Sequence, residues 1–268
     1  MTGSVNTRAG VHAETTAIQI HKPKTAIQPM NRNNDPMGSA IMEYAQTGKA
    51  ATLRVLSSMF DEDEIDVPYL FRSVCDMPET ERTALSMAEG RVLDVGAGAG
   101  CHTLALQDTH TVTAIDISPL SVEAMTMRGV NDVRCTDVFD TSLNEQFDTI
   151  LLLMNGTGIA GRLERMSALL NRLKELLADG GQILMDASDL CYIYEDENGF
   201  IDLTGVEGYY GEVDYQMVYR DIAGERFDWL YIDYETLETV AAGCGLACEK
   251  IADGEHYDYL ARLKMVKG

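Results

Sequence analysis

Short apolar runs alternate with helix-like stretches through the C-terminal two thirds of the chain. The runs are Val92–Val95, Thr111–Ile115, Asp132–Cys135, Phe147–Met154 and Gln182–Asp186. The fourth run is almost continuously apolar, which is typical of a central parallel strand covered on both faces. Strands that alternate with helices in this way predict an α/β domain with a mainly parallel sheet.

The clearest helix lies between the fourth and fifth of these strands. Its apolar side chains share one stripe, formed by Leu163, Met166, Leu169, Leu170, Leu173, Leu176 and Leu177. Charged side chains occupy the opposite side, as in a helix that covers a sheet. Gly180-Gly181 predicts the end of this helix.

Two strands, 246–251 and 257–265, close the chain around the tight turn Asp253–His256 and are therefore antiparallel. The strand before the turn runs parallel to the rest of the sheet. The turn then lies at the carboxyl edge, where α/β proteins bind ligands. His256 is a candidate general base there, since histidine exchanges a proton near neutral pH. A solvent-exposed turn histidine is the alternative.

Two segments lie outside this minimal alternation. Residues 35–89 are expected to form a helical extension, because Ala40–Tyr44 and Thr52–Leu56 show helical apolar spacing, with the acidic Asp61–Glu64 as a solvated turn. Residues 1–34 are interpreted as a basic polar tail. In the insertion 189–232, apolar and polar side chains alternate between residues 209 and 219. A turn and a second strand-like run follow, which predicts a β-hairpin.

The first strand opens into three alternating glycines, Gly96, Gly98 and Gly100. Glycines let the chain turn sharply and approach a ligand closely, and the following helix offers free N–H groups. Asp94, inside the strand, is expected to fix the N–H groups of this loop or to meet the ligand, because an unused buried carboxylate is costly. The pattern predicts a nucleotide-like ligand, and a turn that binds nothing is the alternative.

Two further acids follow the next strands. Asp116 lies 20 residues beyond Gly96, where a β-α-β nucleotide fold places the acid that accepts the ribose hydroxyls. Asp137 follows the third strand and reaches the same edge, with a solvated loop acid as the alternative. A dinucleotide fingerprint needs a glycine where this chain has Cys101.

With its D-x-G-x-G-x-G pattern, the chain resembles the class I methyltransferases that use S-adenosylmethionine, from about Gly90 to the C-terminus. The resemblance implies a Rossmann-like seven-stranded sheet with an antiparallel last strand, helices on both faces, and S-adenosylmethionine as cofactor. In that family the glycine loop wraps the methionine part, and the acids after the second and third strands hold the ribose and the adenine amino group. These roles fall on Asp94, Gly96, Ala97, Gly98 and Gly100, on Asp116 with Ile117, and on Asp137 with Val138.

The resemblance also assigns the end of the fourth strand, Met154 and Asn155, to the border between cofactor and acceptor. The Asn155 amide is a candidate to orient an acceptor, although Asn-Gly is a turn signal in its own right. In the helical extension, which caps the cofactor site in the family, Tyr69 and Arg72 are candidates to meet the carboxylate of the cofactor or the acceptor. Packing of Tyr69 and Phe71 on the sheet, with Arg72 at the surface, is the alternative.

The hairpin insertion is interpreted as a lid over the acceptor. Tyr209 and Tyr210 are then candidate acceptor contacts, and Tyr210 joins Asn155 and His256 as a candidate catalytic residue. A half-buried sheet or a homodimer contact is the alternative.

The net charge of the chain limits the classes of acceptor to be expected. The 268-residue chain has a net charge of -22 and no basic run, which disfavours a nucleic-acid substrate and favours a small neutral or cationic acceptor. No apolar run reaches membrane-spanning length. Six scattered cysteines indicate a reducing, cytoplasmic compartment, and five dispersed histidines predict no metal site.

The sequence therefore predicts a methyltransferase that acts on a small molecule by direct displacement. Another enzyme class on the same fold, an aminopropyl transferase or a nicotinamide oxidoreductase, stays open, as does a non-catalytic cofactor-binding module. The glycine spacing and the closing hairpin argue against the oxidoreductase.

Overall fold

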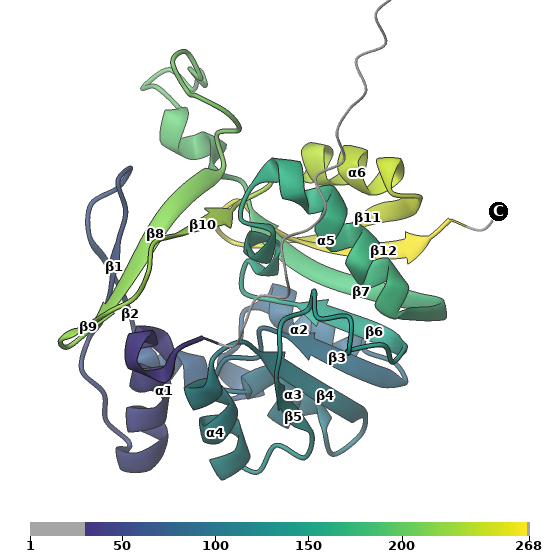
Figure 1. Cartoon of the computed structure of the whole chain (residues 1–268). Helices are drawn as coiled ribbons and strands as arrows, with labels where there is room; N and C mark the ends of the chain where they lie inside the picture. The colour runs from purple at the N-terminus through teal and green to yellow at the C-terminus, as the bar shows by residue number, and fades with distance from the viewer. Residues whose placement is uncertain (1–29, 267–268) are drawn as a thin grey trace, which may run out of the picture.

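The computed structural model describes residues 30–266, and its centre is a seven-stranded sheet in the order β11-β12-β7-β6-β3-β4-β5 (Figure 1). The strands are β3 (Arg91–Val95), β4 (Thr111–Asp116), β5 (Val133–Cys135), β6 (Phe147–Leu152), β7 (Leu177–Ser188), β11 (Leu246–Asp253) and β12 (Asp258–Met265). Neighbouring strands pair in parallel except β12, which runs antiparallel to both β7 and β11. The predicted Rossmann-like sheet with an antiparallel last strand is confirmed.

Helices cover both faces of this sheet (Figure 1). The helices on one face are α5 (Leu163–Leu176) and α6 (Tyr234–Gly243), and those on the other are α2 (Glu79–Ser86), α3 (Cys101–Leu106) and α4 (Pro119–Met127). The apolar stripe predicted for α5 is buried in the core. Of the helices within residues 30–266, none has the length and apolar character to cross a membrane.

The end of α5 differs from the prediction. The helix stops at Leu176, and β7 begins at Leu177, which pairs with Phe147 of β6. Gly180-Gly181 therefore do not end the helix. They lie in an irregular part of β7, where the pairing with β6 shifts register before it resumes at Gln182.

A second sheet joins the N-terminal extension to the insertion after β7. Its strands are β1 (Leu53–Leu56), β2 (Asp63–Ile65), β8 (Glu212–Tyr219), β9 (Ile222–Ala223) and β10 (Phe227–Leu230), in the order β10-β8-β1-β2 with β9 beside β8. The predicted hairpin is present as β8 paired with β10, and β8 also pairs with β1. In Figure 1 this sheet stands to the side of the main sheet.

The N-terminal extension contains less helix than predicted. Its one α-helix before α2, α1 (Pro36–Thr47), includes Ala40–Tyr44, is capped by the Asp35 side chain and packs on α4. The helix predicted at Thr52–Leu56 is wrong, because Leu53–Leu56 form β1 between β2 and β8. The predicted turn at Asp61–Glu64 is partly wrong, since β2 begins at Asp63. Apolar spacing over so few residues is compatible with both a helix and a strand. Pairing with the distant strand β8 determines that this segment is a strand.

Short 3-10 helices complete the described chain. They are η1 (Arg32–Asn34), η2 (Val67–Phe71), η3 (Val74–Asp76), η4 (Gly156–Ala160) and η5 (Leu190–Tyr194). Residues 1–29 of the predicted basic tail lie outside the described residues. The segment that follows them contacts α4, where Arg32 pairs with Glu123 at 2.5 Å.

Candidate functional site

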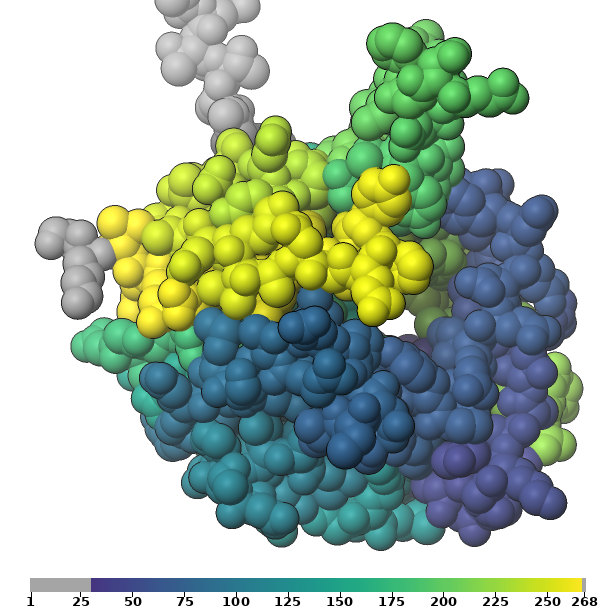
Figure 2. Space-filling view, turned by 180° about the vertical axis from the view of Figure 1, so that it is seen from behind, coloured from purple at the N-terminus to yellow at the C-terminus, as the bar shows by residue number. Residues whose placement is uncertain are grey.

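One large cavity lies between the carboxyl edge of the main sheet and the second sheet. Its volume is about 1700 Å³. On the face seen in Figure 2, the yellow C-terminal hairpin, the blue N-terminal extension and the green insertion border a hollow. The predicted site residues that line the cavity are Tyr69, Asp94, Gly96, Ala97, Gly98, Asp116, Ile117, Asp137, Val138, Met154, Asn155 and His256. Gly100, Arg72 and Tyr210 are not among the lining residues.

The glycine loop leaves β3 with a left-handed backbone at each glycine. The φ angles are +71° at Gly96, +57° at Gly98 and +81° at Gly100. Gly96 and Gly98 line the cavity, so the absence of a Cβ there keeps the backbone accessible. Gly100 serves the packing of the fold instead. A Cβ at this position would lie 2.9 Å from Cγ of Met125, so the glycine allows α4 to pack closely.

Asp116 holds the glycine loop in place. Its carboxylate accepts the N–H of Gly98 at 2.8 Å and the N–H of Ser118 at 2.8 Å. Burial raises the pKa of Asp116 to about 6, although both N–H donors act in the opposite direction. Each carboxylate oxygen keeps a lone pair free for a ligand.

Of the two roles predicted for Asp94, the structure does not show a hydrogen bond to the loop N–H groups, and contact with a ligand stays a prediction. Its carboxylate is buried and accepts a hydrogen bond from the hydroxyl of Thr103 in α3 at 2.6 Å. The loop N–H of Gly98 goes to Asp116 instead. Asp94 therefore ties β3 to the start of α3, while it also borders the cavity.

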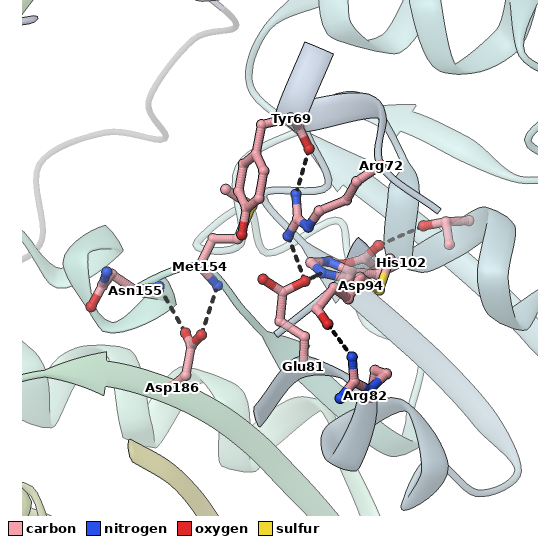
Figure 3. A network of polar contacts seen from close by, with 11 residues as sticks. Tyr69, Arg72, Glu81, Arg82, Asp94, His102, Met154, Asn155 and Asp186 are labelled. Atoms are coloured by element: carbon pink, nitrogen blue, oxygen red, sulfur yellow. Dashed lines mark hydrogen bonds and ion pairs between the residues drawn. The ribbon is translucent and has the colours of Figure 1, made fainter. Parts of the chain in front are cut away.

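The end of β6 depends on Asp186, which no sequence motif singled out. Met154 and Asn155 have φ angles of +64° and +57°, a conformation that such side chains rarely adopt. The Asp186 carboxylate accepts the N–H of Asn155 at 2.7 Å and that of Met154 at 3.1 Å (Figure 3). Burial raises the pKa of Asp186 to about 6. The one signal in the sequence was an acid that ends an apolar strand.

Asn155 also carries an unused hydrogen-bonding atom. Its Oδ1 is buried and has no donor among the described residues. A buried acceptor without a donor costs about 1 to 3 kcal/mol, so a ligand that donates a hydrogen bond here would be stabilised. The placement supports the prediction that the amide orients a bound molecule.

Arg72 belongs to a buried ionic cluster and does not line the cavity (Figure 3). Its guanidinium bonds Glu81 Oε2 at 2.5 Å and the carbonyl of Tyr69 at 2.9 Å, and His102 Nε2 bonds the same Glu81 oxygen at 2.9 Å. Burial opposes a charged imidazole, but hydrogen bonds and nearby acidic groups raise the pKa of His102 to about 10. The raised pKa favours a protonated His102 beside Arg72, with the Glu81 carboxylate shared between the two.

This cluster corrects the prediction that Arg72 meets a ligand, and the alternative of a surface position is also wrong, because only 7% of Arg72 is exposed. Arg72 lies against the ring of Tyr69, with its Cζ 4.2 Å from the ring centroid. Tyr69 is 40% exposed and lines the cavity, so Arg72 packs behind a residue of the cavity wall. Glu81 and His102 were missed because their charges are brought together only by the packing of α2 and α3.

Tyr210 is also engaged elsewhere. Its hydroxyl donates to Asp189 Oδ1 at 2.7 Å, and the neighbouring Tyr209 hydroxyl bonds Asp233 at 2.5 Å. Burial and these carboxylates raise the pKa of both phenols. Tyr209 ties the insertion to Asp233 at the start of α6, and Tyr210 ties it to Asp189, its own first residue. The prediction of acceptor contacts and a catalytic Tyr210 is therefore corrected.

His256 lies in the turn between β11 and β12 and lines the cavity, as the topology predicted. Its side chain is exposed, and its backbone N–H donates to Asp258 at 2.8 Å. The imidazole is thus available to a molecule bound in the cavity.

The opposite wall of the cavity comes from the second sheet. Its strands β8 and β10 belong to the hairpin predicted as a lid, but the side chains that line the cavity were not predicted. The wall carries Tyr215, Phe227, Trp229 and Tyr231. Trp229 packs on Gly158 so closely that a Cβ there would lie 1.9 Å from its Cε2 atom. The only signal was the alternation of aromatic residues along 227–231.

Comparison with known proteins gives a consistent result. A family model described as a methyltransferase domain matches residues 92–181. The crystal structure of an S-adenosylmethionine-dependent methyltransferase from Bacteroides fragilis, in complex with S-adenosyl-L-homocysteine, is 54% identical, with a TM-score of 0.84. It covers 90% of this chain and 98% of its own.

Two more distant proteins are also similar. An uncharacterized methyltransferase from Staphylococcus carnosus is 28% identical over 168 residues, which are 62% of this chain and 74% of that protein. The sugar N-methyltransferase KedS8 from Streptoalloteichus is 18% identical, covers 70% of this chain and 85% of its own, and has a TM-score of 0.50. At that identity the likeness concerns the fold alone.

Proposed function

Because the chain belongs to the S-adenosylmethionine-dependent methyltransferases, we propose that it methylates a small molecule bound between its two sheets. The size of the cavity carries this proposal. A pocket for one drug-sized ligand measures roughly 300 to 1000 Å³. The volume of about 1700 Å³ therefore has room for a second small molecule beside the cofactor.

The carboxyl edge of the main sheet fits the cofactor. Gly96 and Gly98 expose their backbone, Asp116 offers free lone pairs to paired hydroxyl groups, and the Asn155 Oδ1 lacks a donor among the residues that the structure describes. When bound, S-adenosylmethionine supplies a methyl group made electrophilic by its positively charged sulfur. Carboxylates around the cavity suit such a cation.

The chain itself aligns the reactants and keeps water out. Asp186 fixes the backbone of Met154 and Asn155 at the end of β6. A few residues later along the chain, the indole of Trp229 packs directly on Gly158. Through η4, the end of β6 is thus held against the wall that the second sheet forms.

His256 has the position of a general base. It stands at the cavity edge, where it could take the proton that an alcohol, phenol or amine loses on methylation. The proposal predicts that His256→Gln slows methyl transfer but leaves cofactor affinity unchanged. A matched control is His110→Gln, since His110 bonds the carbonyl of Ala88 and does not line the cavity.

The test uses S-adenosylmethionine with a labelled methyl group. The purified protein is incubated with it and, in separate reactions, with the small-molecule, protein and nucleic-acid fractions of a cell extract. Label is expected in the small-molecule fraction. Label confined to protein or nucleic acid would overturn the proposal.

A further inference from the structure

One face of the second sheet packs on α1 at one end and borders the cavity at the other end. At one end Leu53 and Tyr219, which are paired between β1 and β8, are buried against α1. Two residues further along the same face, Val55 and Met217 are paired and line the cavity. The open end of the face therefore borders the space of the cavity.

The aromatic side chains sit on this open end. Tyr215 is paired with Phe227, and their ring centroids are 6.2 Å apart. The rings of Phe227 and Trp229 lie 6.0 Å apart at 82°, and the hydroxyls of Tyr215 and Tyr231 lie 3.0 Å apart. Edge-to-face packing of this kind holds the rings rigidly and presents aromatic faces and edges to the cavity.

A carboxylate joins the aromatic side chains on the same face. The register pairs Val55 with Asp63 on β2 as well as with Met217 on β8, so Asp63 points to the cavity side. Burial is the largest cause of the raised pKa of Tyr215 and Tyr231, and the negative charge of Asp63 adds to it in both cases. In the described part of the chain, no Lys, Arg or His forms an ion pair with Asp63.

The cavity as a whole is strongly acidic. Its lining includes eleven Asp and Glu residues, against two arginines, Arg165 and Arg226, and His102, whose pKa is raised. Two of the acids, Glu62 and Asp228, are paired with arginines outside the lining. Arg226 is already paired with Asp214, and the Arg165 guanidinium lies 5.9 Å from the ring centroid of Phe139. A carboxylate or phosphate group would therefore be repelled from the second sheet, whereas a cation would be attracted.

This inference rests on the proposed function. We propose that the acceptor carries a protonated amine on an apolar body and is held by Asp63 and the aromatic side chains Tyr215, Phe227, Trp229 and Tyr231. The ammonium is the group that the site recognises; because it has no lone pair, it has to give its proton to a base before its nitrogen can take a methyl group. Aromatic faces attract an ammonium group, and a carboxylate accepts its N–H donors in a charge-assisted hydrogen bond. The apolar body of the molecule would cover the rings. Asp63 is exposed and hydrated, so a neutral acceptor of the same shape would lack the charge-assisted hydrogen bond that an ammonium gains there.

The test compares three probes that share one skeleton and differ in charge: phenethylamine, phenethyl alcohol and hydrocinnamate. Each is titrated calorimetrically into the protein already saturated with S-adenosyl-L-homocysteine, so that binding is read without any methyl transfer. The amine is expected to bind at least about tenfold more tightly than the other two probes. Equal affinities, tighter binding of the alcohol or the carboxylate, or no binding of the amine would overturn the inference.

Two variants locate the recognition. Asp63→Asn is expected to weaken amine binding about tenfold or more and to leave the affinity for S-adenosyl-L-homocysteine unchanged. Asp221→Asn is the control, because it removes the same charge from an exposed turn that does not line the cavity. Loss of amine binding in both variants, or in neither, would contradict the assignment to Asp63.

The same titrations separate this inference from the proposed function. If S-adenosyl-L-homocysteine fails to bind, the cofactor site and the proposed function fail. If it binds, and label is transferred to a neutral or acidic small molecule while the three probes bind alike, the proposed function stands and only the amine assignment is lost.

Discussion

Asp186 accepts the backbone N–H of Asn155 at 2.7 Å, across the sheet from the end of β7 to the end of β6. This bond, with its neighbour to Met154, holds two residues in a left-handed conformation at the point where the cofactor wall meets the acceptor space. Such conformations cost about 1 to 3 kcal/mol each and persist only where the surroundings enforce them. Asp186 is the residue that enforces them here.

Removal of the Asp186 charge should therefore lower stability. In Asp186→Asn an amide N–H₂ replaces one of the two acceptor oxygens and faces a backbone N–H. We expect the free energy of unfolding near pH 7 to fall by about 1 to 3 kcal/mol, measured by urea denaturation. Asp253→Asn, on an exposed carboxylate of the β11–β12 turn, should change it by less than about 0.5 kcal/mol.

The raised pKa of Asp186 also predicts how the loss depends on pH. An acid whose pKa in the folded protein is about 6, above its usual value, stabilises the fold fully below about pH 4, and this contribution is lost as the pH rises through about 6. The destabilisation caused by Asp186→Asn should thus be larger at about pH 4 than at about pH 7, by of the order of 2 kcal/mol. Equal losses at both pH values would show that Asp186 titrates normally.

Asp116 should control cofactor affinity. Asp116→Ala removes the carboxylate that we propose accepts the ribose hydroxyls and frees the N–H of Gly98, so we expect the dissociation constant of S-adenosylmethionine to rise about ten- to a hundredfold. Calorimetry measures this directly. Asp108→Ala, at an exposed position after α3 and away from the cavity lining, should leave the constant unchanged. An unchanged constant in Asp116→Ala would refute the assignment.

The affinity for the cofactor should also weaken in acid. The pKa of Asp116 is about 6 without a ligand, and the protonated carboxyl has fewer acceptor sites and no negative charge for a cationic ligand. The dissociation constant of S-adenosylmethionine should therefore rise as the pH falls below about 6 and stay level above it. In Asp116→Ala this dependence should largely vanish.

The contact between Gly158 and Trp229 allows a mutational test of the cavity wall that the second sheet forms. Gly158→Ala places a Cβ within 1.9 Å of the indole, which must move. We expect methyl transfer to slow by about tenfold or more while the affinity for S-adenosyl-L-homocysteine changes little. Trp229 is the only tryptophan of the chain, so its fluorescence reports the displacement.

A matched substitution controls for the added methyl group. A Cβ at Gly243, near the end of α6, meets no other atom within 4 Å. Gly243→Ala should leave both the fluorescence and the rate of methyl transfer unchanged. If Gly158→Ala behaves in the same way, the packing of Trp229 does not shape the acceptor wall.

Features encoded locally could be predicted from the sequence. The glycine loop, Asp116 and the amphipathic α5 follow from residue spacing along one segment, and the closing hairpin fixed the position of His256 through topology alone. The comparison with the Bacteroides protein supports the cofactor that this spacing implied.

Features that depend on distant contacts could not be predicted. β1 is a strand because Leu53 pairs with Tyr219, which is far away in the sequence. Arg72 turns from the cavity because α2 supplies Glu81, and Tyr210 is occupied by Asp189. In each case the partner was visible in the sequence but the proximity was not.

The most direct test of the account is a crystal structure of the protein with S-adenosyl-L-homocysteine bound. The account predicts that the ribose hydroxyls contact Asp116, that the ligand lies along Gly96–Gly98, and that the space beside Trp229 stays open for an acceptor. A ligand that fills the space beside Trp229, or that leaves Asp116 without contact, would contradict it.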